Sequence, residues 1–176
     1  MLSMLDACLK RLQEMPVCLL YPPMEALPIL HVRPMTGDDL DSVMAIETAS
    51  YSTPWKPEHF RNEIASRFSW PYVAVEDDSV VGYVCLMSLF EEAQILNIAV
   101  APGKRGRGIA RLLLEQAFSR ALEQGGEVVA LEVRASNSAA ISLYEKLGFA
   151  RVGIRARYYD AVEDAVLMEK TLKENQ

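Results

Sequence analysis

Residues that build metal centres and disulfide frameworks are scarce in this sequence. Its 176 residues include only three cysteines and two histidines, and no two cysteines form a CxxC pair. An odd cysteine count without paired spacing gives no sign of a disulfide framework or a zinc site. Two histidines are too few for the usual histidine-based site, so we expect no metal.

Long apolar segments and an excess of basic residues are also lacking. No segment approaches the ~20 apolar residues of a membrane span. Lys10 and Arg11 precede only a short apolar run, which is too brief for a secretory signal. The 18 basic residues face 24 acidic ones, giving a net charge of −6. This balance argues against nucleic acid as the main partner and fits a basic peptide or an amine. We expect a cytoplasmic protein that binds neither nucleic acid nor membrane.

The chain contains enough apolar material for one folded domain. Its residues are 51% hydrophobic, which suits a single domain of this length with a full core. Residues 1–29 differ from the rest, because leucines at helical spacing from Leu2 to Leu12 are followed by a proline-rich stretch. We therefore expect an N-terminal extension over 1–29, of unknown role, and a single domain over 30–176.

From Leu30 onward the pattern predicts alternating strands and helices. The first part reads as strands at 30–33, 72–75, 80–89 and 95–100, with helices at 36–49 and 57–66. The second part reads as helices from 112 to 124 and 138 to 146, with strands at 128–133, 150–157 and 165–172. A hairpin followed by strand–helix–strand units predicts an α/β fold in which a mixed sheet carries helices on its faces.

A basic, glycine-rich turn separates the strand at 95–100 from the following helix. It reads Arg105-Gly106-Arg107-Gly108-Ile109-Ala110-Arg111, and no acidic residue lies between Ala101 and Leu114. Glycines at the start of a helix let backbone N–H groups gather around an anion, where the helix dipole adds favourable partial charge. In an acidic chain, a polyphosphate ligand is the simplest reason for this turn. The alternative is an ordinary solvated loop.

Two common phosphate motifs do not fit the turn. A P-loop needs Ser or Thr after Gly-Lys, whereas Gly103-Lys104 is followed by Arg105. The dinucleotide fingerprint needs a third small residue where Arg111 stands, and the expected ribose-binding acid is missing. The turn therefore belongs to another class of phosphate binder.

The motif Arg-x-x-Gly-x-Ala, at Arg105, Gly108 and Ala110, resembles the pyrophosphate loop of the GNAT superfamily of N-acetyltransferases. The stretch 131–149 (LEVRASNSAAISLYEKLGF) is similar, nearly residue for residue, to the closing motif of its ribosomal-protein alanine N-acetyltransferases, the RimI subfamily. The resemblance covers about 30–172. It implies the GNAT fold, with a mixed, mostly antiparallel sheet flanked by helices on both faces. It also implies acetyl-CoA as co-substrate and the N-terminal alanine of ribosomal protein S18 as acceptor.

Acetyl transfer to an α-amine sets the chemical requirements. An α-amine has a pKa of about 8, so most copies are protonated at neutral pH. The reaction needs a base for that proton, an N–H donor for the developing oxyanion and an acid for the departing thiolate. A covalent intermediate is not required, because the thioester is already activated.

Glu132 and Tyr144 are the candidate catalytic residues. Glu132 interrupts an apolar strand that we expect to be buried on both faces, where a carboxylate must be paired or lie at a cleft. The alternative is a structural ion pair with a residue such as Arg134. Tyr144 lies on an apolar stripe of its predicted helix, and this position alone favours the interpretation that Tyr144 is an aromatic residue of the core. The resemblance implies that Glu132 is the base and that Tyr144 protonates the CoA sulfur.

The resemblance also implies the binding residues. Asn137 at a helix start is an ordinary N-cap, whereas the family places this residue on the pantetheine arm; we expect it to do only one of these. Backbone groups of the central strand pair with the pantetheine, and the turn holds the pyrophosphate. The implied cofactor set is Ile98, Ala99, Val100, Arg105, Gly106, Arg107, Gly108, Ile109, Ala110 and Asn137.

The acceptor groove is implied at Glu47, Tyr51, Trp55 and Tyr158. The alternatives are that Glu47 is a solvated helix residue and that residues 54–57 (PWKP) form a structural connection. Two other functions stay open: acetylation of lysine side chains or small amines, and a non-catalytic CoA-binding sensor. The chain has both Glu132 and Tyr144, and a protein that only binds CoA would not need this pair, which argues against the sensor.

Overall fold

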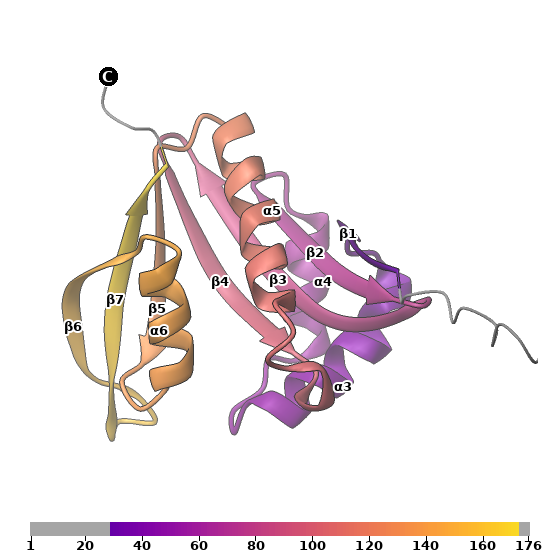
Figure 1. Ribbon diagram of the computed structural model, residues 1–176, viewed down its shortest axis with the longest axis horizontal. Coiled ribbons are helices and arrows are strands. Elements are labelled where there is room, and N and C mark those ends of the chain that lie inside the picture. Colours follow the sequence, from indigo (N-terminus) through magenta and orange to yellow (C-terminus); the bar gives the residue numbers. More distant parts are fainter. Residues whose placement is uncertain (1–28, 173–176) are drawn as a thin grey trace, which may run out of the picture.

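The computed structural model describes residues 29–172 (Figure 1). The helix predicted within residues 1–29 lies outside the described residues, so the N-terminal extension stays a prediction. None of the helices within residues 29–172 is long and apolar enough to span a bilayer.

A seven-stranded sheet forms the centre of the described part of the chain, in the order β1-β2-β3-β4-β5-β7-β6. Neighbouring strands pair antiparallel except β4 and β5, which run parallel. This confirms the mixed, mostly antiparallel sheet. The strands are β1 (Leu30–Pro34), β2 (Ser69–Glu76), β3 (Ser79–Leu89), β4 (Glu92–Val100), β5 (Val128–Arg134), β6 (Ala150–Tyr159) and β7 (Glu163–Thr171).

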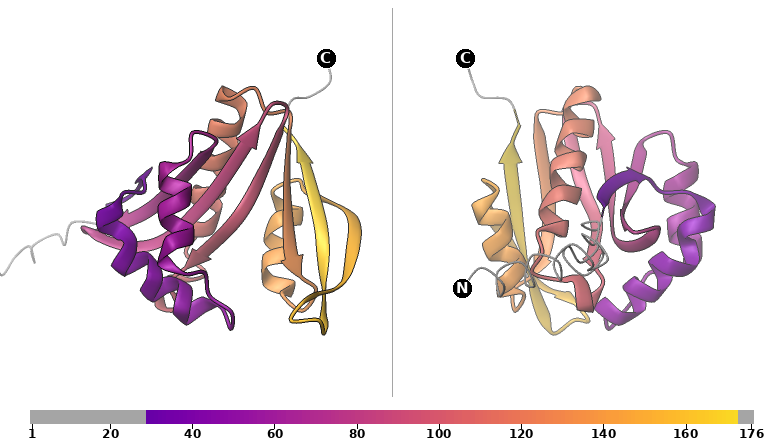
Figure 2. Two further views of the ribbon diagram at one scale, coloured as in Figure 1. Left: turned by 180° about the vertical axis from the view of Figure 1, so that it is seen from behind. Right: turned by 45° about the vertical axis from the view of Figure 1, so that its right-hand side comes forward.

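Helices cover both faces of the sheet, as predicted (Figures 1 and 2). The helices α5 (Ile109–Glu123) and α6 (Ser138–Lys146) share one apolar core with the sheet. The helices α3 (Leu40–Ser50) and α4 (Pro57–Ala65) build a second core on the other face, against β2, β3 and β4. Two 3₁₀ turns, η1 (Gly37–Asp39) and η2 (Pro102–Lys104), precede α3 and the glycine turn. Seen from behind, β5, β7 and β6 carry no helix from residues 29–172 on this second face (Figure 2).

Two local expectations were wrong. The helix after the glycine turn begins at Ile109 rather than Leu112, because Gly108 takes a left-handed conformation at the N-cap and nothing in the next three residues opposes a helix. The strand β5 is not buried on both faces. Its alternate residues Val129, Leu131 and Val133 are buried, whereas those between are only partly covered.

The sheet opens between β4 and β5. These strands pair from Glu92 with Val128 to Ile95 with Leu131, and no further. At this point Leu96 is an extra residue in the pairing of β4 with β3, because Asn97 pairs with Cys85 and Ile95 with Leu86. Such a β-bulge bends its strand and increases the local twist. Beyond it β4 follows β3 and leaves β5, beside the starts of α5 and α6 (Figure 1).

The packing of α5 against β3 leaves no space for a side chain at Gly82. A Cβ there would lie 3.0 Å from the Ala99 carbonyl oxygen and 3.2 Å from Leu113. We expect Gly82→Val to lower the free energy of unfolding by about 1–3 kcal/mol, the usual cost of overpacking. Urea denaturation measures this change. The control is Gly37→Val, where a Cβ would meet nothing within 4 Å. Equal effects of the two substitutions would contradict the prediction.

Candidate active site

A cleft of about 1080 Å³ lies where β4 and β5 separate. It is lined by the end of α3 and the following loop, β4, the glycine turn, β5, α6 and the β6–β7 hairpin. Every predicted site residue lines this cleft except Arg107. Segments more than a hundred residues apart in the sequence therefore meet in one place.

The glycine turn presents backbone to the cleft, and its side chains are largely engaged elsewhere. Gly106 and Gly108 have positive φ angles of 75° and 80°, which glycine adopts without strain. Both Lys104 and Arg107 bind the buried carboxylate of Glu76, with Arg107 Nη2 2.6 Å from Glu76 Oε1. The two cations hold the pKa of Glu76 below its usual range. Arg107 thus points away from the cleft.

Arg105 is placed differently. Its Nε donates to the Val100 carbonyl at 3.0 Å and its Nη2 to Ser50 Oγ at 3.0 Å. Within residues 29–172 it has no carboxylate partner, whereas Arg111 pairs with Glu115 at 2.7 Å. Arg105 is therefore the turn arginine best placed to meet an anion, together with the N–H groups at the start of α5.

The edge of β4 beyond the bulge faces the cleft. The Ile98 carbonyl accepts a hydrogen bond from the Tyr51 hydroxyl at 2.6 Å, and the Val100 carbonyl accepts from Arg105. Because N–H and C=O of one strand residue point to the same side, the N–H groups of Ile98 and Val100 face the cleft too. This edge has the donors and acceptors that an amide-containing pantetheine arm requires.

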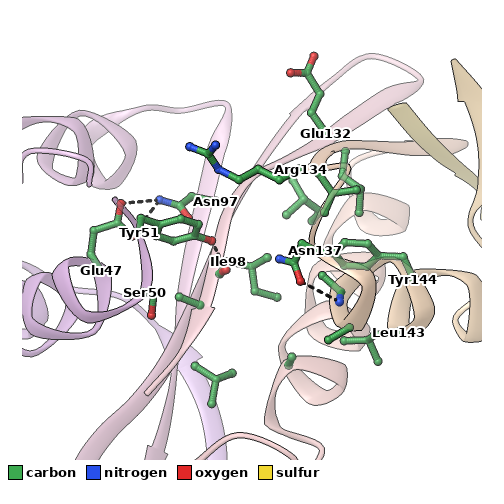
Figure 3. A pocket seen from close by; sticks show the side chains of 18 of the residues that line it. Glu47, Ser50, Tyr51, Asn97, Ile98, Glu132, Arg134, Asn137, Leu143 and Tyr144 are labelled. Carbon is green, nitrogen blue, oxygen red and sulfur yellow. Dashed lines mark hydrogen bonds between the residues drawn. The ribbon is translucent and has the colours of Figure 1, made fainter. Parts of the chain in front are cut away.

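Asn137 caps α6 and still faces the cleft. Its Oδ1 accepts from the Ala140 N–H at 3.1 Å, as an N-cap residue does. The amide nitrogen points into the cleft toward Ile98 (Figure 3) and has no partner among residues 29–172. The structure therefore confirms the N-cap role of the Asn137 oxygen, and a contact of its amide nitrogen with the pantetheine arm stays a prediction.

Tyr144 is a core residue and a cleft residue at once. It is 7% exposed and packs against Phe149 with ring centroids 5.7 Å apart. Burial raises the pKa of the Tyr144 hydroxyl to about 12, so it keeps its proton at neutral pH. Within residues 29–172 the hydroxyl has no hydrogen-bond partner, which leaves its proton available to a group in the cleft.

Glu132 lies on the opposite face of β5 from Tyr144. Its neighbours Leu131 and Val133 belong to the core under α6, so the Glu132 side chain points the other way (Figure 3). The carboxylate pairs with Arg155, with Nη1 2.9 Å from Oε1. The alternative reading, an ion pair of Glu132 with an arginine, is therefore met, although by Arg155 and not by Arg134. Arg134 instead binds Asp160 and Glu163, each at 2.9 Å.

The acceptor residues predicted around the α3–α4 loop gather on one side of the cleft. The Trp55 ring packs against His59 and Phe60. The backbone N–H of Trp55 donates to Glu47 Oε1 at 2.7 Å. Tyr158 is 48% exposed. Glu47 is 1% exposed, so the reading of Glu47 as a solvated helix residue was wrong.

Sequence reasoning missed several residues of this site. Arg155 holds Glu132, and Tyr83 and Asn97 bind the Glu47 carboxylate. Asn97 carried a readable signal, because it is a polar residue in an otherwise apolar strand, as Glu132 is. Arg155 and Tyr83 carried none, since arginine and tyrosine are ordinary residues in strands.

The geometry defines a class of enzyme. The cleft passes through an opened sheet, and a glycine turn suited to an anion lies beside it at a helix start. A phenol and a carboxylate lie on its two faces. This arrangement suits a group transferase that brings two substrates together. Residues 40–149, more than half of the chain, match the model of the acetyltransferase (GNAT) family. The chain belongs to this family.

Similar proteins match about three quarters or more of this chain. A Bacillus subtilis relative is 37% identical over 145 residues, which are 81% of this chain and 96% of the relative. The [ribosomal protein bS18]-alanine N-acetyltransferase of Salmonella typhimurium is 36% identical, over 76% of this chain and 92% of its own. The crystal structure of the Escherichia coli ribosomal-protein-S18-alanine N-acetyltransferase superposes with a TM-score of 0.77 at 30% identity, covering 84% and 97% of the two chains.

Acetyl-CoA is the donor that acetyltransferases of this family use. A structural neighbour at 25% identity and TM-score 0.73, covering 82% of this chain and 99% of its own, is a NatC complex bound to Gag peptide and CoA. In this chain the residues fit such a donor. Arg105 and the α5 start suit the pyrophosphate, and the β4 edge with the Asn137 amide suits the pantetheine amides.

Arg105 and Arg107 should differ in their effect on CoA affinity. We expect Arg105→Ala to raise the Kd for CoA about tenfold or more, because a hydrogen bond to a charged group contributes ~1.5–3 kcal/mol. Arg107→Ala should raise it less, because Glu76 already holds that side chain. Calorimetry at low and high salt measures both, and the Arg105 effect should shrink in salt. An equal or larger effect of Arg107→Ala would place the phosphates elsewhere.

The raised pKa of Tyr144 should appear in the alkaline stability of the protein. The unfolded phenol titrates near pH 10, whereas the folded one keeps its proton up to about pH 12. The stability from this group is fully present below pH 10 and is lost as the pH rises through 12. The free energy of unfolding of the wild type should therefore fall more steeply across this window than that of Tyr144→Phe. Parallel curves would show that Tyr144 titrates normally.

Proposed function

We propose that the protein is an acetyl-CoA-dependent Nα-acetyltransferase that acetylates the N-terminal alanine of ribosomal protein bS18. The observation that carries the reaction type is the cleft at the β4–β5 opening, with Glu132 on one face of β5 and Tyr144 on the other. The acceptor follows from relatives that match this chain over most of their own length and bear this activity in their names. Such an acceptor places the reaction in the cytoplasm.

Each substrate approaches from its own face. The donor lies between α5 and α6, held by Arg105, the turn backbone, the β4 edge and Asn137. When bound, acetyl-CoA supplies an activated thioester. The acceptor peptide enters on the face that carries Glu132 and the Trp55 loop. The two meet where the strands separate, in line with direct transfer in a ternary complex.

The chain's own groups supply the proton transfers. Glu132 Oε1 is held by Arg155, so Oε2 is the oxygen that takes the proton of the acceptor ammonium. An N–H of the β4 edge, at Ile98 or Val100, donates to the oxygen on which negative charge develops. As the C–N bond forms and the C–S bond breaks, the Tyr144 hydroxyl, protonated at neutral pH, gives its proton to the departing sulfur. The second proton that the nitrogen loses on becoming an amide passes to solvent, from which the Tyr144 phenol is restored.

The acceptor side carries an excess of negative charge, which suits a basic peptide. Four carboxylates lie at or beside this part of the cleft: Glu47, Glu132, Asp160 and Glu163. Two arginines, Arg134 and Arg155, lie among them, so two of these negative charges are not balanced. A cationic peptide is attracted to such a surface, and the attraction weakens with salt. Tyr51, Trp55 and Tyr158 supply the apolar walls.

A peptide panel tests the acceptor. Peptides with the bS18 N-terminal sequence, varied only at the first residue, are incubated with acetyl-CoA and analysed by mass spectrometry, beside an N-terminally blocked lysine peptide and a polyamine. We expect acetylation on the α-amine, with alanine first giving the highest kcat/KM. Preference for the blocked lysine peptide or the polyamine would overturn the acceptor assignment.

The base is tested by Glu132→Gln. We expect kcat to fall by about 10²–10⁴, the usual share of general base catalysis, with the Kd for acetyl-CoA nearly unchanged. Glu145→Gln is the matched control, because Glu145 lies on α6 in a surface ion pair with Arg151. Unchanged turnover in Glu132→Gln would remove the proposed base. Binding without turnover in the wild type would support the sensor instead.

A further inference from the structure

The Glu47 carboxylate is a buried charge without a cation beside it. The residue is 1% exposed, and among residues 29–172 no lysine, arginine or histidine forms an ion pair with it. Burying a carboxylate without a counter-ion is costly and is tolerated when neutral donors satisfy it. This arrangement needs a reason, and it lies at the acceptor wall of the cleft.

Three neutral donors satisfy the Glu47 oxygens. The Tyr83 hydroxyl donates to Oε2, and the backbone N–H of Trp55 donates to Oε1 at 2.7 Å. The Asn97 amide Nδ2 lies 3.3 Å from both oxygens. Burial raises the pKa of the Tyr83 hydroxyl, so that the phenol stays a donor. Because its oxygens are occupied and covered, Glu47 reaches an acceptor only through the residues it holds.

Glu47 fixes both ends of the loop that carries the acceptor residues. Its backbone carbonyl accepts from the Tyr51 N–H at 3.0 Å, where α3 ends. Its side chain accepts from the Trp55 N–H, where the loop approaches α4. One residue therefore determines the conformation of the short segment that presents Tyr51 and Trp55 to the cleft.

The same residue ties this loop to the bulged strand. Asn97 directly follows the bulge residue Leu96, and the next residue, Ile98, accepts a hydrogen bond from the Tyr51 hydroxyl at 2.6 Å. The loop is thus attached to β4 at two adjacent residues, one through a side chain and one through the backbone (Figure 3). The acceptor wall and the edge that faces the donor are held in one network.

We propose that Glu47 is the positioning residue of the acceptor site, fastening the Tyr51–Trp55 loop to β4 beside the bulge so that the acceptor amine meets the donor in register. This inference rests on the proposed acetyltransferase function. It assigns to Glu47 no proton transfer and no direct contact with the peptide.

Two measurements on Glu47→Gln test the proposal. The glutamine amide has nearly the same shape as the carboxylate. Its NH₂ group cannot accept a hydrogen bond, so at least one of the donors from Trp55, Tyr83 and Asn97 loses its acceptor. By hydrogen exchange, residues 51–56 should exchange faster than in the wild type, while residues 105–111 stay unchanged. In steady-state kinetics, kcat/KM for the acceptor peptide should fall on the order of 10- to 100-fold through misplacement, with the KM for acetyl-CoA nearly unchanged.

Further variants keep the test decisive. Glu63→Gln is the control, since Glu63 is a partly buried carboxylate on α4 that accepts from Ser69 Oγ away from the cleft; it should change neither readout. If Glu47→Gln does not fold, Tyr83→Phe removes one donor and keeps the ring packing against Phe60, and it should act in the same direction.

The outcomes separate this proposal from the proposed function. Unchanged exchange at 51–56, or a parallel loss in acetyl-CoA binding, would overturn the positioning role. If the wild type acetylates none of the acceptors, the proposed function fails, while the exchange experiment still decides whether Glu47 holds the loop.

Discussion

The site depends on the loss of pairing between β4 and β5 after Ile95 and Leu131. A parallel pair that continued would close the sheet, satisfy the β4 edge and leave no passage between its faces. The extra residue Leu96 keeps β4 with β3 and turns it away from β5. The unpaired edge then exposes backbone donors and acceptors, and the starts of α5 and α6 come to lie beside the opening.

This opening also explains why the two candidate catalytic groups lie on different faces of one strand. Residues of a strand alternate between faces, so Glu132 points away from the core that holds Leu131, Val133 and the α6 helix. In a closed sheet these faces would be separate environments. At the opening they meet, so the proposed base Glu132 and the proposed acid Tyr144 can serve one reaction.

Much of the fold was readable because local signals agreed with the final structure. The helix predicted at 138–146 has those bounds, since Asn137 supplies its cap and Gly148 follows its end. The start of α5 was misplaced because the continuous leucine run begins at Leu112, whereas the helix begins at Ile109, after the left-handed Gly108. The β4 bulge was beyond sequence reasoning, because pairing with two neighbours decides it.

The candidate site was predicted less completely than the fold. A polar residue in an apolar strand pointed to Glu132, and the same signal at Asn97 was not used. The partners of both carboxylates come from distant segments, Arg155 on β6 and Tyr83 on β3, which only the tertiary structure brings together. The cluster of basic residues at 104–111 also suggested more positive charge for a phosphate than the structure provides. Lys104 and Arg107 form ion pairs with Glu76, at the end of β2.

The two carboxylates at the cleft illustrate how environment assigns roles. Glu132 has a side chain 17% exposed, one arginine partner and one oxygen without a partner in the described residues. That oxygen can meet a group in the cleft. Glu47 is enclosed, and donors from three different segments fix both of its oxygens. Any movement of Glu47 would leave buried donors unsatisfied, which is costly in a low-dielectric interior. The carboxylate with a free oxygen therefore suits the proposed proton transfer, and the enclosed one suits the proposed holding of the acceptor loop to the strand that opens the sheet.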